Sequence, residues 1–98
     1  METKINHGDV MTISLTGRLD TVTSAELSKE LEKEEIKEGL VIMDMKDLEY
    51  ISSAGLRLLL SFKKKLSSDG KSLEIHNLND VCKEVFRVTG FKNILTVK

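Results

Sequence analysis

The clearest pattern of apolar and polar positions lies between Asp47 and Gly70. It predicts a short loop that runs into an amphipathic helix, because large apolar residues recur at helical spacing with charged and hydroxyl residues opposite them. Gly70 suits the left-handed residue that ends many helices, and three lysines near that end complement the helix dipole. The predicted buried face comprises Leu56, Leu59, Leu60, Phe62 and Leu66, and the predicted exposed face Arg57, Ser61, Lys64, Lys65 and Ser68.

Two serines, Ser52 and Ser53, stand at the start of this helix. A serine there can accept a hydrogen bond from an unpaired backbone N–H of the first turn, so we expect one of the two to be the N-cap. The same N–H groups and the positive end of the helix dipole also make this a place where phosphate is tolerated. Local sequence alone favours capping, but a phosphate on Ser53 would add about −1.5 to −2 charges to the surface.

The N-terminal part of the chain predicts a β-hairpin. Residues Val10–Thr16 come close to strict alternation of apolar and polar side chains, as in a half-buried strand. Gly8 and Asp9 favour a turn before it, and residues 1–7 could supply a short edge strand. Gly17 is expected to end the second strand.

Further strands follow the hairpin. Leu40–Met45 is a nearly continuous apolar run, typical of a central strand covered on both faces. Its Asp44 is either a catalytic or phosphoacceptor carboxylate or, as we favour, a strand-end carboxylate that is hydrogen-bonded to the following loop. Ser72–His76 alternates as a strand does, and His76 fits a loop residue better than a ligand because no cluster of ligands accompanies it. The apolar residues between Phe91 and Val97 suggest a last short strand.

Two more helices are predicted. The first begins near Asp20, Thr21 and Thr23, any of which could cap it, and is expected to end at Gly39. Its partial apolar face comprises Ala25, Leu27, Leu31 and Ile36. The second is capped by Asn79 or Asp80 and runs to Gly90, with an apolar face of Val81, Cys82, Val85, Phe86 and Val88.

Strands and helices thus alternate along the chain. This order predicts an α/β fold with a mixed, mainly parallel central sheet, a hairpin at its edge and helices packed against it. At 98 residues, the chain is expected to form one domain, residues 1–98.

Composition narrows the classes of function. Apolar residues make up 40% and charged residues 32%, with a net charge of −1, so nucleic acid is not a favoured partner. Cys82 is the only cysteine, which excludes an internal disulfide, and it has no metal-ligand spacing with His7 or His76. No apolar run reaches the roughly 18 residues of a membrane span. We expect a cytoplasmic protein without metal, cofactor or membrane insertion.

The motifs together resemble the STAS domain, specifically the bacterial anti-sigma factor antagonists. The stretch DLEYISSAGLRLLL is similar to the family signature of an aromatic residue, any residue, Asp, Ser, Ser or Thr, Gly and Leu, whose first serine is phosphorylated. GRLD at Gly17–Asp20 resembles a family turn, VIMDM the central strand, and VFRVTGFKNILTV the final helix, glycine and strand. The resemblance covers essentially the whole chain.

The resemblance implies roles for particular residues. By position, Ser53 is the phosphoacceptor, Gly55 lets loop and helix pack closely, and Asp20 and Ser52 flank the site. The partner surface would be this loop and the exposed helix face with Arg57 and Ser61.

The resemblance also implies partners. The unphosphorylated protein would bind an anti-sigma factor that is a serine kinase and so release a sigma factor. Phosphorylation of Ser53 by that kinase would block binding, and a serine phosphatase would reset it. The protein would have no catalysis of its own.

Two departures from the family pattern matter. Ser52 stands where the family often has aspartate, so Ser52 could itself be modified. The sequence stops after Val97 and Lys98 without the closing helix of many members. Uncovered apolar surface there would favour self-association as a weak homodimer.

Two other functions stay open at this point. One is a constitutive scaffold of the same fold, such as a STAS subunit of a transporter or sensory complex, in which Ser53 is only a cap. The other is a small phosphotransfer protein that accepts phosphate on Asp44 or His76. The sequence supports the latter poorly, because no acidic pair closes the first strand to hold Mg²⁺ and no Gly-rich phosphate loop is present.

Overall fold

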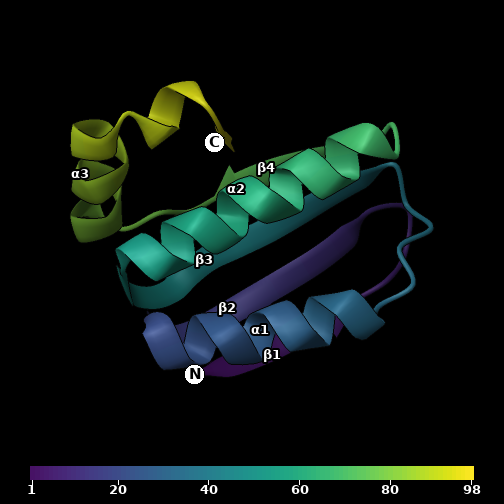
Figure 1. Cartoon of the computed structure of the whole chain (residues 1–98), viewed down its shortest axis with the longest axis horizontal. Coiled ribbons are helices and arrows are strands. Elements are labelled where there is room, and N and C mark those ends of the chain that lie inside the picture. The colour runs from purple at the N-terminus through teal and green to yellow at the C-terminus, as the bar shows by residue number, and fades with distance from the viewer.

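The computed structural model describes residues 1–98, which form five strands and three α-helices (Figure 1). In chain order the elements are β1 (Glu2–Asn6), β2 (Met11–Leu19), α1 (Thr21–Lys33), β3 (Leu40–Ile51), α2 (Ser53–Ser68), β4 (Ser72–His76), α3 (Asp80–Thr89), the 3₁₀ turn η1 (Phe91–Asn93) and β5 (Thr96–Val97). The strands make one sheet in the order β1-β2-β3-β4-β5. Only β1 is antiparallel to its neighbour. The predicted mixed, mainly parallel sheet with a hairpin edge is confirmed.

Two helices cover one face of this sheet. α1 and α2 pack against each other and lie side by side in front of the strands in Figure 1. Both begin at the end of the sheet where β2 and β3 finish, and α3 lies beside that same end. We call this the site end.

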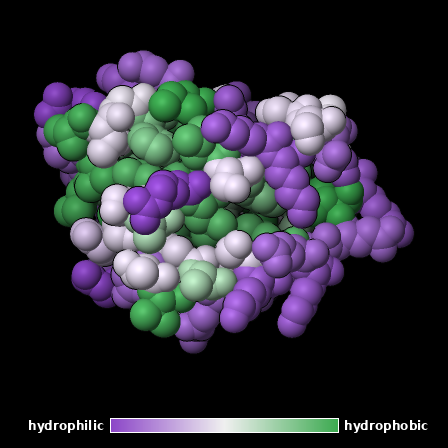
Figure 2. Space-filling model, viewed as in Figure 1, coloured by the Kyte–Doolittle hydropathy of each residue, from purple (hydrophilic) through white to green (hydrophobic).

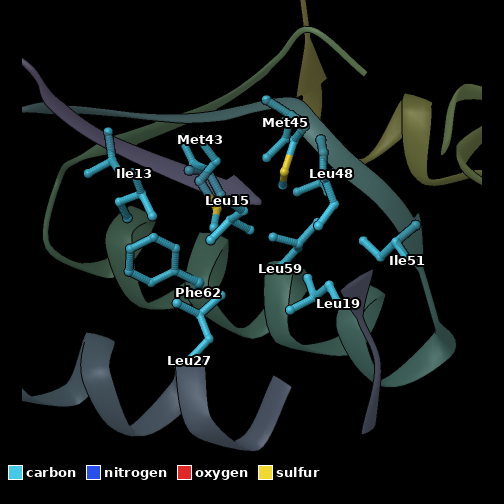
Figure 3. Close-up of a cluster of buried hydrophobic side chains, with 14 of the residues drawn as sticks. Ile13, Leu15, Leu19, Leu27, Met43, Met45, Leu48, Ile51, Leu59 and Phe62 are labelled. Atoms are coloured by element: carbon cyan, nitrogen blue, oxygen red, sulfur yellow. The ribbon is translucent and has the colours of Figure 1, made fainter. Parts of the chain in front are cut away.

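The core lies between the sheet and this helix pair (Figure 3). Alternate residues of β2 and β3, such as Ile13 and Met43, point toward α1 and α2 and are fully buried. Leu59 and Phe62 of α2 meet them from the other side. Each such side chain contributes about 1.5–3 kcal/mol by leaving water. The residues between them on the strands, on the face away from the helices, are mostly only partly buried.

The central strands are longer than the sequence pattern predicted. β3 continues to Ile51, so Asp47–Ile51 is strand rather than loop. β2 does not end at Gly17, which instead adopts a φ of 107° where the pairing with β3 shifts register. A shift of this kind is a β-bulge, which bends the strand without ending it, and glycine is the residue that tolerates such a φ.

The helix boundaries also differ in part. α1 ends at Lys33 rather than Gly39, so Ile36 lies in the following linker, where Lys71 Nζ donates a hydrogen bond to its carbonyl. Ala25, expected on the buried face of α1, is exposed, as are Val81 and Val88 of α3. α2 closes as predicted, with Gly70 in the left-handed region at a φ of 73°.

Candidate phosphorylation and partner-binding site

The site is built from two neighbouring strand ends. Leu19, the last residue of β2, pairs with Ile51, the last residue of β3. The Ser52 N–H then donates to the Leu19 carbonyl at 2.9 Å. As a result α1 and α2 start next to each other, and the positive ends of their dipoles face the same surface.

Asp20 is the N-cap of α1. Its Oδ1 accepts from the backbone N–H groups of Val22 at 3.1 Å and Thr23 at 3.0 Å. In return the Thr23 hydroxyl accepts from the Asp20 N–H at 2.8 Å, which completes a capping box. The hydrogen bonds from the Thr23 backbone and hydroxyl hold the pKa of the Asp20 carboxyl below its usual value. This side chain is therefore ionised at neutral pH and fixed in place.

The two serines play different parts. Ser52 is the N-cap of α2: its backbone is extended, and its Oγ accepts from the Gly55 N–H at 3.3 Å. Ser53 is the first residue of the helix proper, and it is exposed. Its hydroxyl thus lies at the N-terminus of α2 and is open to solvent.

Gly55 brings α2 close to the strand ends. A Cβ at this position would lie 2.8 Å from Ile51 Cγ1 and 3.0 Å from both Leu19 Cγ and the Leu19 carbonyl oxygen. Only a glycine fits this spacing without displacing the strand or the helix. Because Gly55 is buried, it positions Ser52 and Ser53 rather than offering surface of its own.

Arg57 and Ser61 lie on the exposed face of α2, one and two turns beyond Ser53. Ser61 borders a shallow cleft of about 90 Å³ between α1 and α2. The other residues lining this cleft are Ser28, Leu31, Glu32, Leu58, Phe62 and Lys65. Ser61 is therefore farther from the helix start and closer to α1 than the other predicted site residues.

Two features of the site end were missed by the sequence interpretation. Arg18 stacks on the Tyr50 ring, with its guanidinium carbon 4.5 Å from the ring centroid. The two residues are neighbours only because β2 and β3 pair in parallel, so no local pattern could reveal the contact. The second feature is exposed apolar side chains: Val22 in the first turn of α1 and Val81 and Val88 of α3 have exposed fractions of 67%, 56% and 64%. For α3 the sequence already indicated exposed apolar residues, because its apolar residues outnumber the positions that one helix face can bury.

α3 is anchored at this end by its own cap. Asn79 accepts from the Cys82 N–H at 2.8 Å, and its amide donates to the Leu48 carbonyl at 3.0 Å. Cys82, which the sequence pattern placed on the apolar face of this helix, is fully buried. Figure 2 shows that apolar surface extends over the middle and left of this face of the molecule, toward the site end, whereas the opposite end is mostly hydrophilic.

Asp44 and His76 lie away from this site, on the sheet face that α1 and α2 leave uncovered. Asp44 is within β3 rather than at its end, and its Oδ1 accepts from Lys46 N–H and Asn77 Nδ2, both at 3.0 Å. The hydrogen bond from Asn77 is the main reason that the pKa of Asp44 is lowered. The carboxylate is hydrogen-bonded as predicted, but the prediction of its place and partners is wrong: it lies within the strand and binds Lys46 of that strand and Asn77 after β4, not the loop that follows β3. His76 contacts Glu74 at 2.8 Å.

Comparison with known proteins identifies the family of this chain. The model of the STAS domain matches residues 1–98, the full described chain. The chain belongs to the STAS domain family.

Among STAS proteins, the anti-sigma-B factor antagonist of Listeria monocytogenes is 28% identical over 99 residues, which covers 100% of this chain and 87% of the relative. The Bacillus protein SpoIIAA, an anti-sigma factor antagonist, has been solved in an unphosphorylated form and a phosphorylated form. Both superpose with a TM-score of 0.74, at 15% and 16% identity, and each match covers 99% of this chain and 87% or 91% of the solved chain.

The STAS fold also occurs outside this group. A sulfate transporter family protein from Wolinella succinogenes superposes with a TM-score of 0.80 at 20% identity, covering 96% of this chain and 80% of that one. At such identities the structures establish the fold alone. In the present chain, no helix has both the length and the apolar character needed to cross a membrane.

Proposed function

We propose that this protein is an anti-sigma factor antagonist whose binding is switched off by phosphorylation of Ser53. In its unphosphorylated form it binds an anti-sigma factor that is also a serine kinase, and a sigma factor is released. A serine phosphatase restores the binding form. The protein acts in the cytoplasm as a binding module and catalyses no reaction itself.

The main support for this proposal is that the two serines have different structural roles. Ser52 already satisfies the helix start, so the Ser53 hydroxyl is exposed and is not needed for capping. A phosphate there would lie at the N-termini of both α1 and α2, which tolerate negative charge. Modification would therefore change the surface without unfolding the domain.

The surroundings of Ser53 explain how a phosphate would block binding. At the start of α1 the surface presents the exposed Val22 and the Asp20 carboxylate, which the N–H groups of the first turn hold in place. A partner that packs on the surface around Ser53 would have to strip water from any charge there, and an unpaired buried charge is costly. Adding about −1.5 to −2 charges at Ser53 makes the same contact unfavourable. Arg57, exposed one turn further along α2, would contact the same partner.

The test compares the wild-type protein with Ser53→Ala, Ser53→Asp and a matched control, Ser67→Asp. Ser67 is exposed on the same helix but at its far end, so the control adds the same charge away from the site. Each protein is immobilised and exposed to lysate of the source cells, and retained proteins are identified by mass spectrometry. Circular dichroism confirms that all four fold.

We expect wild type, Ser53→Ala and Ser67→Asp to retain an ATP-binding anti-sigma kinase and Ser53→Asp to lose it. If all four retain the same partner, charge at Ser53 is not read and a constitutive scaffold explains the protein better. Incubation with the retained kinase and ATP provides the second readout. The label should survive acid and disappear in Ser53→Ala, whereas an acid-labile label would indicate Asp44 or His76.

A further inference from the structure

β1 leaves one backbone edge of the sheet open. It is the first strand in the sheet order and pairs only with β2, so its other side carries unpaired N–H and C=O groups. Such an edge is a template for a further strand. The apolar core does not depend on it, because Glu2, Lys4 and Asn6 are exposed and Thr3 and Ile5 are only half-buried.

We propose that β1 is a self-association surface, on which a second copy of this chain pairs antiparallel with Thr3 opposite Thr3. In this register Glu2 of each copy lies opposite Lys4 of the other, on the exposed face of the joined sheet. On the helix side Ile5 lies opposite Met1, which is 39% exposed. Two opposite-charge pairs and two apolar pairs therefore form around one two-fold axis.

The charges select this register over its neighbours. In the two neighbouring symmetric registers the two-fold axis passes through a different residue of β1. With the axis at Lys4, Lys4 of one copy lies opposite Lys4 of the other, and with the axis at Glu2, Glu2 lies opposite Glu2. Like charges directly opposite each other destabilise a strand pair. Charged residues on an edge strand normally prevent association. Here the order Glu2-Thr3-Lys4 disfavours the two neighbouring symmetric registers and favours the register with Thr3 opposite Thr3.

The geometry of such a dimer leaves the candidate site open. A two-fold axis perpendicular to the sheet keeps the helices of both copies on the same face. Ser53 follows β3, two strands in from the β1 edge, so it stays accessible in both copies. The inference is independent of the proposed function. A contact through one five-residue strand is small, so the dimer is expected to form only at high protein concentration.

The test uses charge reversal with reciprocal rescue, measured by sedimentation equilibrium up to millimolar protein. Glu2→Lys and Lys4→Glu each place like charges opposite each other in the homodimer, and each should weaken association about tenfold. An equimolar mixture of the two variants restores both opposite-charge pairs, so it should form a mixed dimer of nearly wild-type affinity. Glu26→Lys, an exposed site on α1, is the matched control and should change nothing.

Cross-linking gives a second readout of the register. Thr3→Cys should form an intermolecular disulfide, because directly opposite residues have Cα atoms about 4.5–5.5 Å apart. Lys4→Cys, displaced from the axis, should not, and Cys82 does not interfere because it is fully buried. A wild-type protein that stays monomeric, a dimer insensitive to both reversals, or variants that fail to rescue each other would each overturn the proposal.

Discussion

At the site end of the sheet the chain is held by apolar packing and helix caps, whereas at the opposite end it is held by ionisable side chains. Gly55 against Leu19 and Ile51 fixes the first. The second is a cluster that we call the clamp, formed by His7, Glu34 and Glu38. It ties the β1–β2 turn to the linker between α1 and β3.

The clamp centres on one imidazole. His7 Nδ1 lies 2.9 Å from Glu38 Oε2 and its Nε2 lies 2.8 Å from Glu34 Oε1. Hydrogen bonds to Glu34 and then to Glu38 raise the pKa of His7. The Glu38 side chain is only 6% exposed, and burial alone would raise the pKa of its carboxyl. Hydrogen bonds from its own amide, from His7 and from the Gly8 N–H outweigh burial, so the pKa of Glu38 is lowered.

The proposed phosphorylation of Ser53 would change the surface most clearly where few other charges titrate. Caps and packing do not titrate near neutral pH, so the shape of the site end stays constant there. The linker carries no such requirement, and charged side chains can secure it.

The largest expected effect comes from breaking the packing at the site end. Gly55→Ala should lower the free energy of unfolding by about 2 kcal/mol, because its Cβ meets strand atoms that cannot move apart freely. Urea denaturation measures the change. Gly39→Ala is the control, since a Cβ there meets nothing within 4 Å, and it should be neutral or slightly stabilising. Equal losses in both variants would contradict the packing role of Gly55.

The next effect separates the two serines. Ser52→Ala should cost about 1 kcal/mol of stability, because the Gly55 N–H loses its capping partner. Ser53→Ala should stay within about 0.5 kcal/mol of wild type, since Ser53 is exposed. Chemical denaturation of both variants, with amide exchange at Gly55, checks the assignment. The reverse order of losses would make Ser53 the cap.

A smaller effect should distinguish the clamp by its pH dependence. Because the pKa of His7 is raised by folding, its contribution to stability is complete below the unfolded pKa and is lost as pH rises through the folded pKa. His7→Gln should therefore lower the melting temperature at mildly acidic pH and leave it unchanged at alkaline pH. Thermal unfolding across this range, with protection of residues 34–38 from amide exchange, is the measurement. A loss that is the same at every pH would show that His7 acts by packing alone.

The smallest effect concerns the Asp20 carboxylate, which caps α1 at the site end. Folding lowers the pKa of Asp20, so its contribution is present above the unfolded pKa and is lost as pH falls through the folded pKa. Asp20→Asn keeps a good N-cap, so stability at neutral pH should barely change while the decline on acidification becomes shallower. Thermal unfolding from neutral to acid pH tests this, and an unchanged acid decline would remove Asp20 from the pH response.

The sequence by itself determined those features that depend on near neighbours. The helical spacing of Leu56, Leu59, Phe62 and Leu66 was enough to place α2 and its buried face, because residues three and four apart share one side of a helix. Alternation did the same for β2 and β4, and Gly70 marked the helix end correctly.

Only the tertiary structure decided what depends on distant partners. β3 runs on to Ile51 because Gly17, Arg18 and Leu19 continue to pair with it beyond the bulge, which no local pattern expresses. The same pairing places Asp20 beside Ser52, and it distinguishes the capping serine from the exposed one. Both serines suit a helix start equally well. Which of them caps α2 depends on where β3 ends, because that strand fixes the first residue of the helix.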